Sequence, residues 1–232
     1  MAKALPAVLL TAALCAGCTS APERQARNDE DLLAERRADV AEQKEGSKRL
    51  IAGLLARAEA KARSPRPTMD MLIISGGGDW GAFGAGVLKG WGRVKGDMAR
   101  PQFDGVTGVS TGALIAPFAF IGDDESIERI VQLYRNPAPD IAVSRGFLFF
   151  WPSNPSLFVL PGLERELRTA LDRSMLERLA AQAASGRLLL VNTTNVDLGQ
   201  MHAWDVLAEA KAAVAHASLG KRGGKILFEF AS

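Results

Sequence analysis

The sequence contains few of the residues on which metal sites and catalytic triads depend. Among its 232 residues are two His and two Cys, and Lys and Arg outnumber Asp and Glu by only 28 to 26. Two Cys exclude a disulfide framework and a Cys-rich zinc site, and two His leave few options for a His-based metal site. A net charge of +2 lacks the basic excess of nucleic-acid-binding proteins. We therefore expect no metal, no nucleic-acid partner, and one generous globular domain or two small ones.

The hydrophobic run at the N-terminus is too short to cross a membrane. Ala4–Leu14 follows the positive Lys3 and falls below the about 20 residues that a transmembrane helix needs. This order is typical of a secretory signal peptide. The sequence then reads LCAGC over residues 14–18, which resembles a bacterial lipoprotein processing box in which Cys18 is acylated and becomes the new N-terminus. Cys15 stands where the usual pattern has Leu, and cleavage without lipidation is the alternative.

These signals divide the chain into three parts. Residues 1–17 are expected to be a lipoprotein signal peptide, and a lipidated Cys18 would anchor the chain to a membrane. Thr19, in place of an Asp, resembles outer-membrane sorting in Gram-negative bacteria, which predicts a location in the cell envelope. Residues 18–67 are rich in charge and predict a helical spacer, whose helix is stopped by the sequence SPRP at residues 64–67; a partner-binding helix is the alternative. Residues 68–232 are left for the main domain.

A glycine-rich turn follows the first predicted strand of this domain. Met69–Ser75 is an apolar run of strand length, and it leads into GGGDWG at residues 76–81 and a helix from Ala82. A strand, a glycine turn and a helix leave unpaired backbone N–H groups that bind an anion. The letters also fit the dinucleotide motif G-x-G-x-x-G, which needs an acidic residue at the end of a second strand about 20 residues on. Asp97 is near that distance but lies in KGDM, which is no strand.

A serine turn follows the second predicted strand. Phe103–Val106 is a short strand candidate, GVSTG occupies residues 108–112, and Ala113–Ile121 forms an apolar helical pattern. The pattern G-x-S-x-G between a strand and a helix is the nucleophile elbow of serine hydrolases. Its serine sits on a strained turn that needs glycine on both sides, and the helix N-terminus faces the developing oxyanion. Gly78 lies 32 residues before Ser110 on its own strand–helix unit, which argues against a chance match.

These two motifs resemble the patatin-like phospholipase family, over roughly residues 69–201. The resemblance implies a three-layer α/β/α fold and hydrolysis of lipid acyl esters by a Ser–Asp dyad that uses no His, metal or cofactor. It makes Ser110 the nucleophile and the amides of the glycine turn the oxyanion hole. The residues that it marks are Ser110, the oxyanion glycines Gly76, Gly77 and Gly78, and the motif glycines Gly81, Gly108 and Gly112. The substrate is expected to be a lipid acyl ester, with its head group and the oligomeric state of the protein left open.

Periodicity predicts the remaining elements of the domain. Helices are expected at Asp124–Tyr134, Leu163–Ala184 and Leu207–Ala217, and a central strand at Leu188–Thr194. The sequence FLFFW at residues 147–151 concentrates four aromatic residues. It predicts packing in the core or in a lid loop, or a part of an acyl-chain pocket.

The second member of the dyad has no counterpart in the sequence. The family carries it in a D-G-G or D-G-A sequence late in the domain, whereas the only Asp-Gly here is Asp104-Gly105, and no Asp follows Asp205. We therefore expect an incomplete C-terminus and low or no activity, because a serine hydroxyl is a weak nucleophile without a base. Two alternatives stay open: a Ser-His-Asp α/β-hydrolase that uses Asp197 and His202, and a non-catalytic lipid-binding or scaffold lipoprotein.

Overall fold

The computed structural model describes residues 28–146, 158–195 and 200–218. By contacts the chain divides into two compact units, residues 1–32 with 138–167 and residues 33–137 with 168–232. Each unit is described by itself. The predicted signal peptide, Cys18, the aromatic run at 147–151 and Asp197 lie outside the described residues, and the predicted domain boundaries stay predictions.

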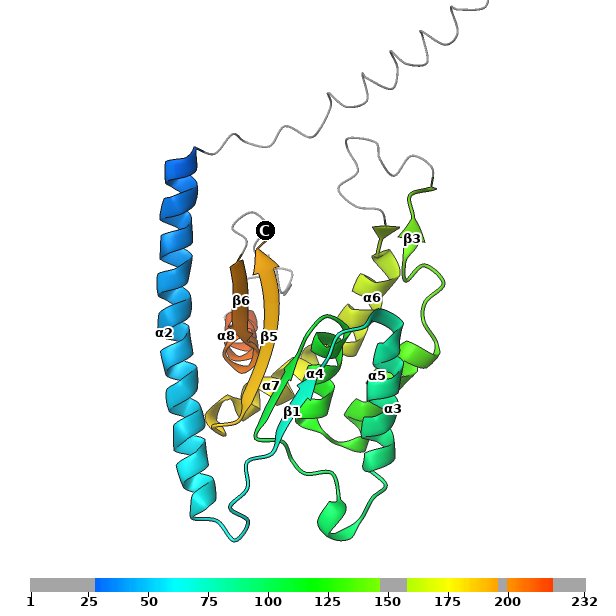
Figure 1. The fold of residues 1–232 in the computed structure, drawn as a ribbon. Coiled ribbons are helices and arrows are strands. Elements are labelled where there is room, and N and C mark those ends of the chain that lie inside the picture. Colours follow the sequence, from blue (N-terminus) through cyan, green and yellow to red (C-terminus); the bar gives the residue numbers. More distant parts are fainter. Residues whose placement is uncertain (1–27, 147–157, 196–199, 219–232) are drawn as a thin grey trace, which may run out of the picture. The chain divides into compact units, whose positions relative to one another are not determined.

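A four-stranded sheet forms the centre of the larger unit (Figure 1). Its order is β1-β2-β5-β6, where β1 is Met71–Ile74, β2 is Gly105–Gly108, β5 is Leu188–Asn195 and β6 is Gln200–Asp205. The first three strands are parallel, and β6 runs antiparallel to β5. β1 and β2 are in register with Ile74 opposite Gly108, so both strands end at the same level. The two turns that the sequence singled out therefore leave the same edge of the sheet.

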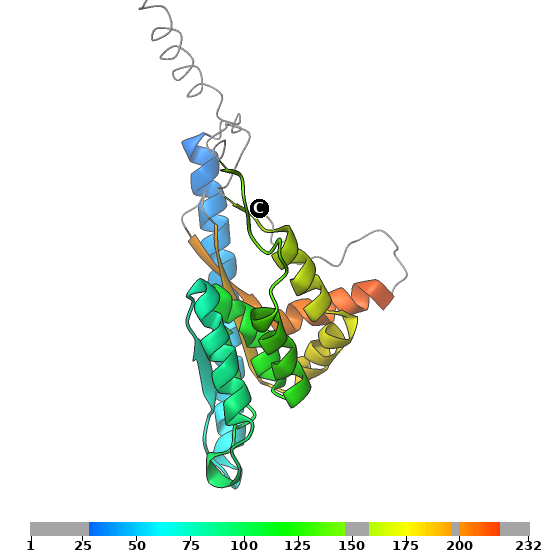
Figure 2. The same cartoon turned by 90° about the vertical axis from the view of Figure 1, so that its right-hand side faces the viewer.

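Helices α3, α4 and α5 form one group that contacts the sheet through α4 (Figure 2). They span Gly81–Trp91, Thr111–Ile121 and Asp124–Arg135. Helix α4 is apolar on all sides, as expected for a helix enclosed by protein, and Ile115, Phe118 and Phe120 are fully buried. Helix α5 begins at the cap of Asp123, whose carboxylate accepts a hydrogen bond from the amide of Ser126 at 2.7 Å. These helices and the mixed sheet give the α/β fold that the sequence predicts.

Two elements differ from the pattern expected in the second half of the chain. Where one helical stretch was expected, the structure has α6 (Pro161–Ala170), α7 (Arg173–Ala181) and a short 3-10 turn (Gln182–Ala184). The break falls at Asp172, whose carboxylate accepts a hydrogen bond from the amide of Met175 at 2.8 Å and so starts a new helix. Strand β6 was not expected at all. It holds His202 inside the sheet rather than beyond a strand end, and it leads into α8 (Val206–Ser218).

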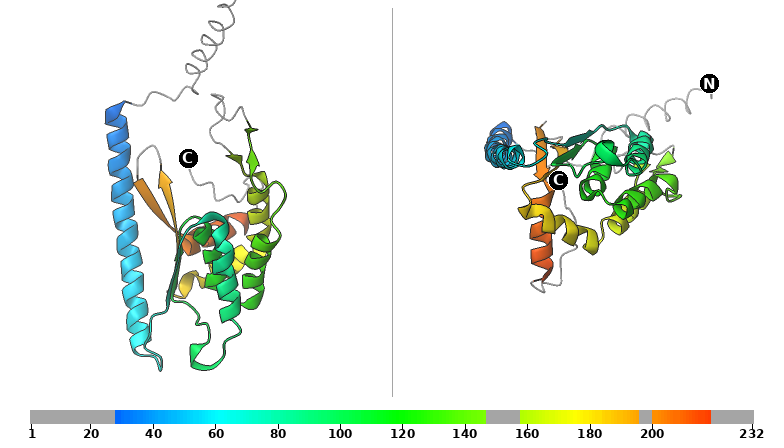
Figure 3. Two further views of the ribbon diagram at one scale, coloured as in Figure 1. Left: turned by 45° about the vertical axis from the view of Figure 1, so that its right-hand side comes forward. Right: turned by 90° about the horizontal axis from the view of Figure 1, so that it is seen from below.

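Helix α2 (Asp29–Ala62) precedes the sheet and has no buried residue. Its first turn carries three acidic residues and its last turn carries Lys61, the arrangement that the helix dipole favours. In the two views of Figure 3 it runs beside the strands. None of the helices in the described segments combines the length and the hydrophobicity needed to span a bilayer.

The smaller unit contains a two-stranded ribbon of β3 (Val143–Ser144) and β4 (Phe158–Val159). Just beyond it, Arg165 on α6 donates two hydrogen bonds to the carboxylate of Asp140, at 3.0 and 2.7 Å. Gly162 is buried, because its Cα faces the backbone of Asp140 and Ile141. A side chain at Gly162 would collide with that backbone.

Candidate active site

The glycine turn and the serine turn meet at the carboxyl ends of β1 and β2. The amide of Val109 donates a hydrogen bond to the carbonyl of Ile74 at 3.1 Å, which continues the ladder between the strands one step beyond β2. A Cβ atom built on Gly76 would stand 3.1 Å from the Cβ of Ser110 and 3.2 Å from the carbonyl oxygen of Val109. The glycine turn thus lies directly against the serine, and only glycine fits at position 76 without a shift.

Ser110 has a strained backbone and an exposed side chain. Its φ of 53° and ψ of −120° make it the one non-glycine residue with a positive φ in the part of the chain that the structure describes. Such a conformation costs about 1–3 kcal/mol and persists only where the surroundings enforce it. Here the helix enforces it, because the amide of Ala113 donates to the carbonyl of Ser110 at 2.9 Å in the first turn of α4. The serine is presented to solvent at the helix N-terminus.

Two glycines make room for this elbow. A Cβ on Gly108 would collide with the backbone of Gly112, and a Cβ on Gly112 would collide with the carbonyl of Ile74. The first turn of α4 therefore packs onto the ends of β1 and β2 at a distance that no side chain allows. The geometry gives a physical reason for glycine at both motif positions of the serine turn.

The glycine turn bends sharply into helix α3. Gly77 and Gly78 both have a positive φ, 146° and 55°, and the amide of Trp80 donates to the carbonyl of Gly77 at 3.1 Å. Within the described residues the amides of Gly76 and Gly77 donate no hydrogen bond. Backbone N–H groups that are left unpaired at such a turn are suited to bind a negatively charged oxygen.

Tyr134 fastens the two turns together, a contact that sequence reasoning missed. Its hydroxyl forms a hydrogen bond with Oγ1 of Thr111, the residue after the serine, and both atoms border the Cα of Gly81. A side chain at Gly81 would displace both. Burial raises the pKa of Tyr134, the hydrogen bond to Thr111 opposes that shift, and the charge of Asp79 adds to it. The phenol therefore stays protonated at neutral pH and acts as a link rather than as a base.

No base accompanies the serine in the described segments. There no side chain forms a hydrogen bond with Oγ of Ser110. The ring of His202 instead packs at a tilt against that of Trp204, with centroids 4.2 Å apart, and its Nδ1 lies 3.6 Å from a carboxylate oxygen of Asp39 on α2. The structure therefore gives the Ser-His-Asp alternative no His–Ser contact.

The Asp of the only Asp-Gly pair is held at the opposite end of β2. Asp104 is fully buried and accepts hydrogen bonds from Nε of Arg57 at 2.8 Å and from the amide of Asp70 at 2.9 Å. Nζ of Lys61 lies 3.1 Å from its second oxygen. Burial alone would raise the pKa of Asp104, but the Asp70 amide and the two cations outweigh it, so the pKa lies below its ordinary value. This carboxylate anchors α2 to the sheet, and strand β2 separates it from Ser110.

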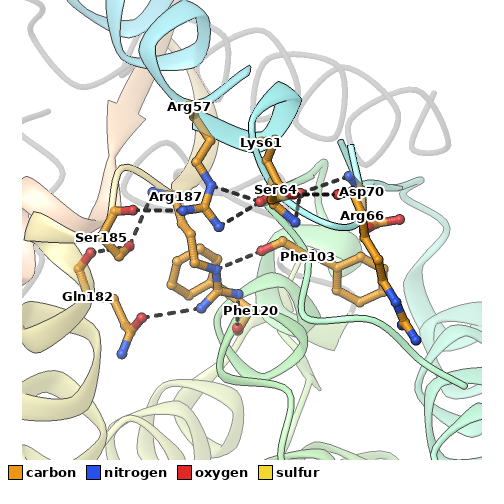
Figure 4. A network of polar contacts seen from close by, with 11 residues as sticks. Arg57, Lys61, Ser64, Arg66, Asp70, Phe103, Phe120, Gln182, Ser185 and Arg187 are labelled. Carbon is orange, nitrogen blue, oxygen red and sulfur yellow. Dashed lines mark hydrogen bonds and ion pairs between the residues drawn. The ribbon is translucent and has the colours of Figure 1, made fainter. Parts of the chain in front are cut away.

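Arg187 completes this network on the sheet side (Figure 4). The guanidinium is buried, donates to the carbonyls of Phe103 at 2.7 Å and Phe120 at 2.6 Å, and lies 3.9 Å over the ring of Phe120. Burial and the nearby charge of Arg57 lower the pKa of Arg187 to about 10, against the opposing charge of Asp104. The arginine links the last turn of α4 to the starts of β2 and β5. This network lies at the amino ends of these strands, whereas Ser110 follows the carboxyl end of β2.

The fold and the two facing turns are those of an α/β protein built around a serine on a strand–turn–helix. The family model described as Patatin-like phospholipase matches residues 72–220, which is more than half of the chain. The chain belongs to the patatin-like phospholipase family, a family of lipid acyl hydrolases, and this confirms the family predicted from the two motifs. Neither the curated proteins nor the solved structures contain a match to the chain.

Proposed function

We propose that this protein is a serine lipid acyl hydrolase in which Ser110 is the nucleophile and the amides of Gly76, Gly77 and Gly78 form the oxyanion hole. The observation that carries the proposal is the position of an exposed, strained serine against a glycine turn with unpaired amides. The match to the family supports a lipid acyl ester as the substrate. No group in the reaction requires a metal or a cofactor.

The reaction follows from this geometry in two steps. Oγ of Ser110, which is exposed to solvent, attacks the ester carbonyl carbon while a water molecule accepts its proton, and the carbonyl oxygen becomes negative in front of the glycine amides. Collapse of this intermediate breaks the ester bond, the leaving oxygen takes up a proton from water and departs as the alcohol, and an acyl-serine remains. Water then attacks the acyl-serine, which releases the fatty acid and restores the hydroxyl. Each oxyanion donor typically contributes about 2.7–4 kcal/mol of transition-state stabilisation.

The level of activity depends on a base that the described residues do not supply to Ser110. A positioned base typically contributes about 10²–10⁴-fold to such a reaction. We therefore expect ester hydrolysis to be slower, by about 10²–10⁴-fold, than in an enzyme whose serine is hydrogen-bonded to a base. The unpaired serine also supports a second candidate, a lipid-binding lipoprotein that retains the site without turnover.

A fluorophosphonate probe and a short-chain p-nitrophenyl ester test both candidates. We expect slow labelling and slow ester hydrolysis that disappear in Ser110→Ala and persist in Ser174→Ala, a matched change at an exposed serine on α7. Labelling that is unaffected by Ser110→Ala would refute the assignment of the nucleophile. Silence of the wild-type chain together with lipid binding would favour the non-catalytic candidate, and loss of activity in His202→Ala would revive the triad.

We also propose that the protein is a lipoprotein of the cell envelope, anchored through Cys18 and sorted to the outer membrane. The support is the charged and apolar pattern of residues 1–17 and the small residues before Cys18. Metabolic labelling with palmitate should mark the wild type and Cys15→Ser but not Cys18→Ser. Equal labelling of Cys18→Ser would contradict the anchor.

A further inference from the structure

Helix α3 and Trp80, the residue that caps its N-terminus, present apolar side chains to solvent along one face. Trp80 is 82% exposed, Phe83 74% and Val87 47%, although all three are large and apolar. At about 100° of rotation per residue, these positions share one side of the helix. The opposite side, with Ala85 and Leu88, is buried. We call Trp80, Phe83 and Val87 the apolar stripe.

The apolar stripe starts at the candidate active site. Trp80 closes the glycine turn, and Val109, the neighbour of Ser110, is itself 55% exposed. At the far end of α3, the indole of Trp91 donates to the carbonyl of Met98 at 2.9 Å, and Met98 is 76% exposed. Large apolar side chains that gather on one exposed face mark an interaction site rather than an ordinary solvated face.

A basic groove lies beside the stripe on the same helix. It is a cavity of about 430 Å³ between α3 and α5, floored by Ala82, Gly86 and Gly90. Three cations line it: Lys89, Arg93 and Arg135. Lys89 is paired with Glu128 at 2.6 Å, whereas Arg93 and Arg135 have exposed side chains. By helical rotation the floor of the groove adjoins Phe83, so the apolar and the basic surfaces are neighbours.

We propose that the stripe and the groove together dock the protein on a lipid bilayer that contains anionic phospholipid. Trp, Phe and Val side chains flanked by cations are the composition of helices that lie in a membrane interface, where Trp is enriched. The basic groove matches the phosphates of anionic head groups, because each Lys or Arg near such a surface is attracted by its negative potential. The proposal rests on the proposed function in one respect: docking brings the exposed Ser110 to the surface where lipid esters reside.

Vesicle sedimentation tests the apolar part with a matched pair of variants. The full chain carrying Cys18→Ser, so that no lipid anchor contributes, is mixed with phosphatidylcholine vesicles with and without phosphatidylglycerol. Phe83→Asp should weaken binding about tenfold or more, since it removes the burial of one large side chain. Leu55→Asp, at a position 60% exposed on α2, should leave binding unchanged. Circular dichroism and urea unfolding confirm that both variants fold.

Two further measurements test the cations of the basic groove and the contact of Trp80 with lipid. Arg93→Glu and Arg135→Glu should weaken binding only to vesicles with phosphatidylglycerol, and Arg37→Glu on α2 should not. Brominated lipid should quench the fluorescence that is lost in Trp80→Phe, which reports contact at that side chain directly. The effect of salt should be larger for the wild type than for Arg93→Glu.

The outcomes separate docking from catalysis. Equal binding of Phe83→Asp and the wild type, or no quenching of Trp80, would overturn the proposal. It would also fail if Phe83→Asp dissolved a dimer while vesicle binding stayed the same, because the stripe would then be a contact between two copies. Ser110→Ala should bind vesicles as the wild type does, so a silent serine with intact docking refutes only the proposed function.

Discussion

The backbone of Gly76 and the side chain of Ser110 leave no room for a methyl group between them, since a Cβ on the glycine would stand 3.1 Å from that of the serine. This contact joins the ends of two neighbouring parallel strands. It couples the position of the glycine amides to the position of the serine oxygen. A shift of either turn therefore changes the geometry in which charge on an ester oxygen would be stabilised.

Gly76→Ala should reduce reaction at the serine without unfolding the chain. The neighbouring atoms must yield by a few tenths of an ångström, and misplacement of a catalytic group by about 1 Å costs about 10²-fold. We expect fluorophosphonate labelling of Ser110 to slow by about tenfold at unchanged urea midpoint. Gly53→Ala on α2, where a Cβ meets nothing within 4 Å, is the control and should label normally. Equal rates in the two variants would contradict a close fit between the turns.

Replacing Ser110 should reveal the strain stored at the elbow. Ser110→Gly and Ser110→Ala both remove the hydroxyl, but only glycine adopts a φ of 53° with little steric cost. We expect Ser110→Gly to be more stable than Ser110→Ala by about 1 kcal/mol in urea unfolding. A more stable alanine variant would mean that the backbone relaxes on removal of the side chain.

Asp104 should make the free energy of unfolding depend on pH in the acidic range. Because its pKa is lowered in the folded state, its contribution is complete above the ordinary carboxyl value and is lost as the pH falls below about 4. Asp104→Asn should cost about 3 kcal/mol at neutral pH, since it leaves Arg57 and Lys61 without their carboxylate. The variant should also lose less stability than the wild type on acidification. Asp97→Asn, at an exposed position, should change neither quantity.

Tyr134 can be titrated alone, because it is the only tyrosine in the sequence. Burial raises its pKa, so ultraviolet absorbance of the phenolate should appear above pH 10 in the folded protein and near its ordinary value in urea. The raised pKa means that this contribution to stability is complete below about pH 10 and declines as the pH rises further. Tyr134→Phe should remove the absorbance change and cost about 1 kcal/mol at neutral pH. A folded-state midpoint below that in urea would contradict the buried link to Thr111.

Local patterns predicted the elements that carry the site. The strand before each turn, the helix after it and the glycines at 108 and 112 are each encoded within a few residues of the turn to which they belong. The sequence signal fails where a partner lies far along the chain. Tyr134 meets Thr111 across 23 residues and Arg57 meets Asp104 across 47, and neither side chain stands in a pattern that indicates its partner.

The missed elements have similar causes. Strand β6 alternates weakly and owes its conformation to pairing with β5, so its own six residues do not reveal it. The break at Asp172 interrupts a hydrophobic period that is equally regular on both sides. Asp172 caps α7 because its own backbone is extended there, and an Asp within a helical pattern does not by itself reveal that the helix stops and starts again.

The place of β1 in the sheet has a consequence for handling the protein. Among the described residues β1 pairs only with β2, and Met71 and Ile73 are 45% and 76% exposed. An apolar edge strand with free backbone groups is a template on which another chain can add a strand. Association through this edge will compete with folding as concentration rises. Ile73→Lys should therefore raise the highest protein concentration at which the chain remains monomeric.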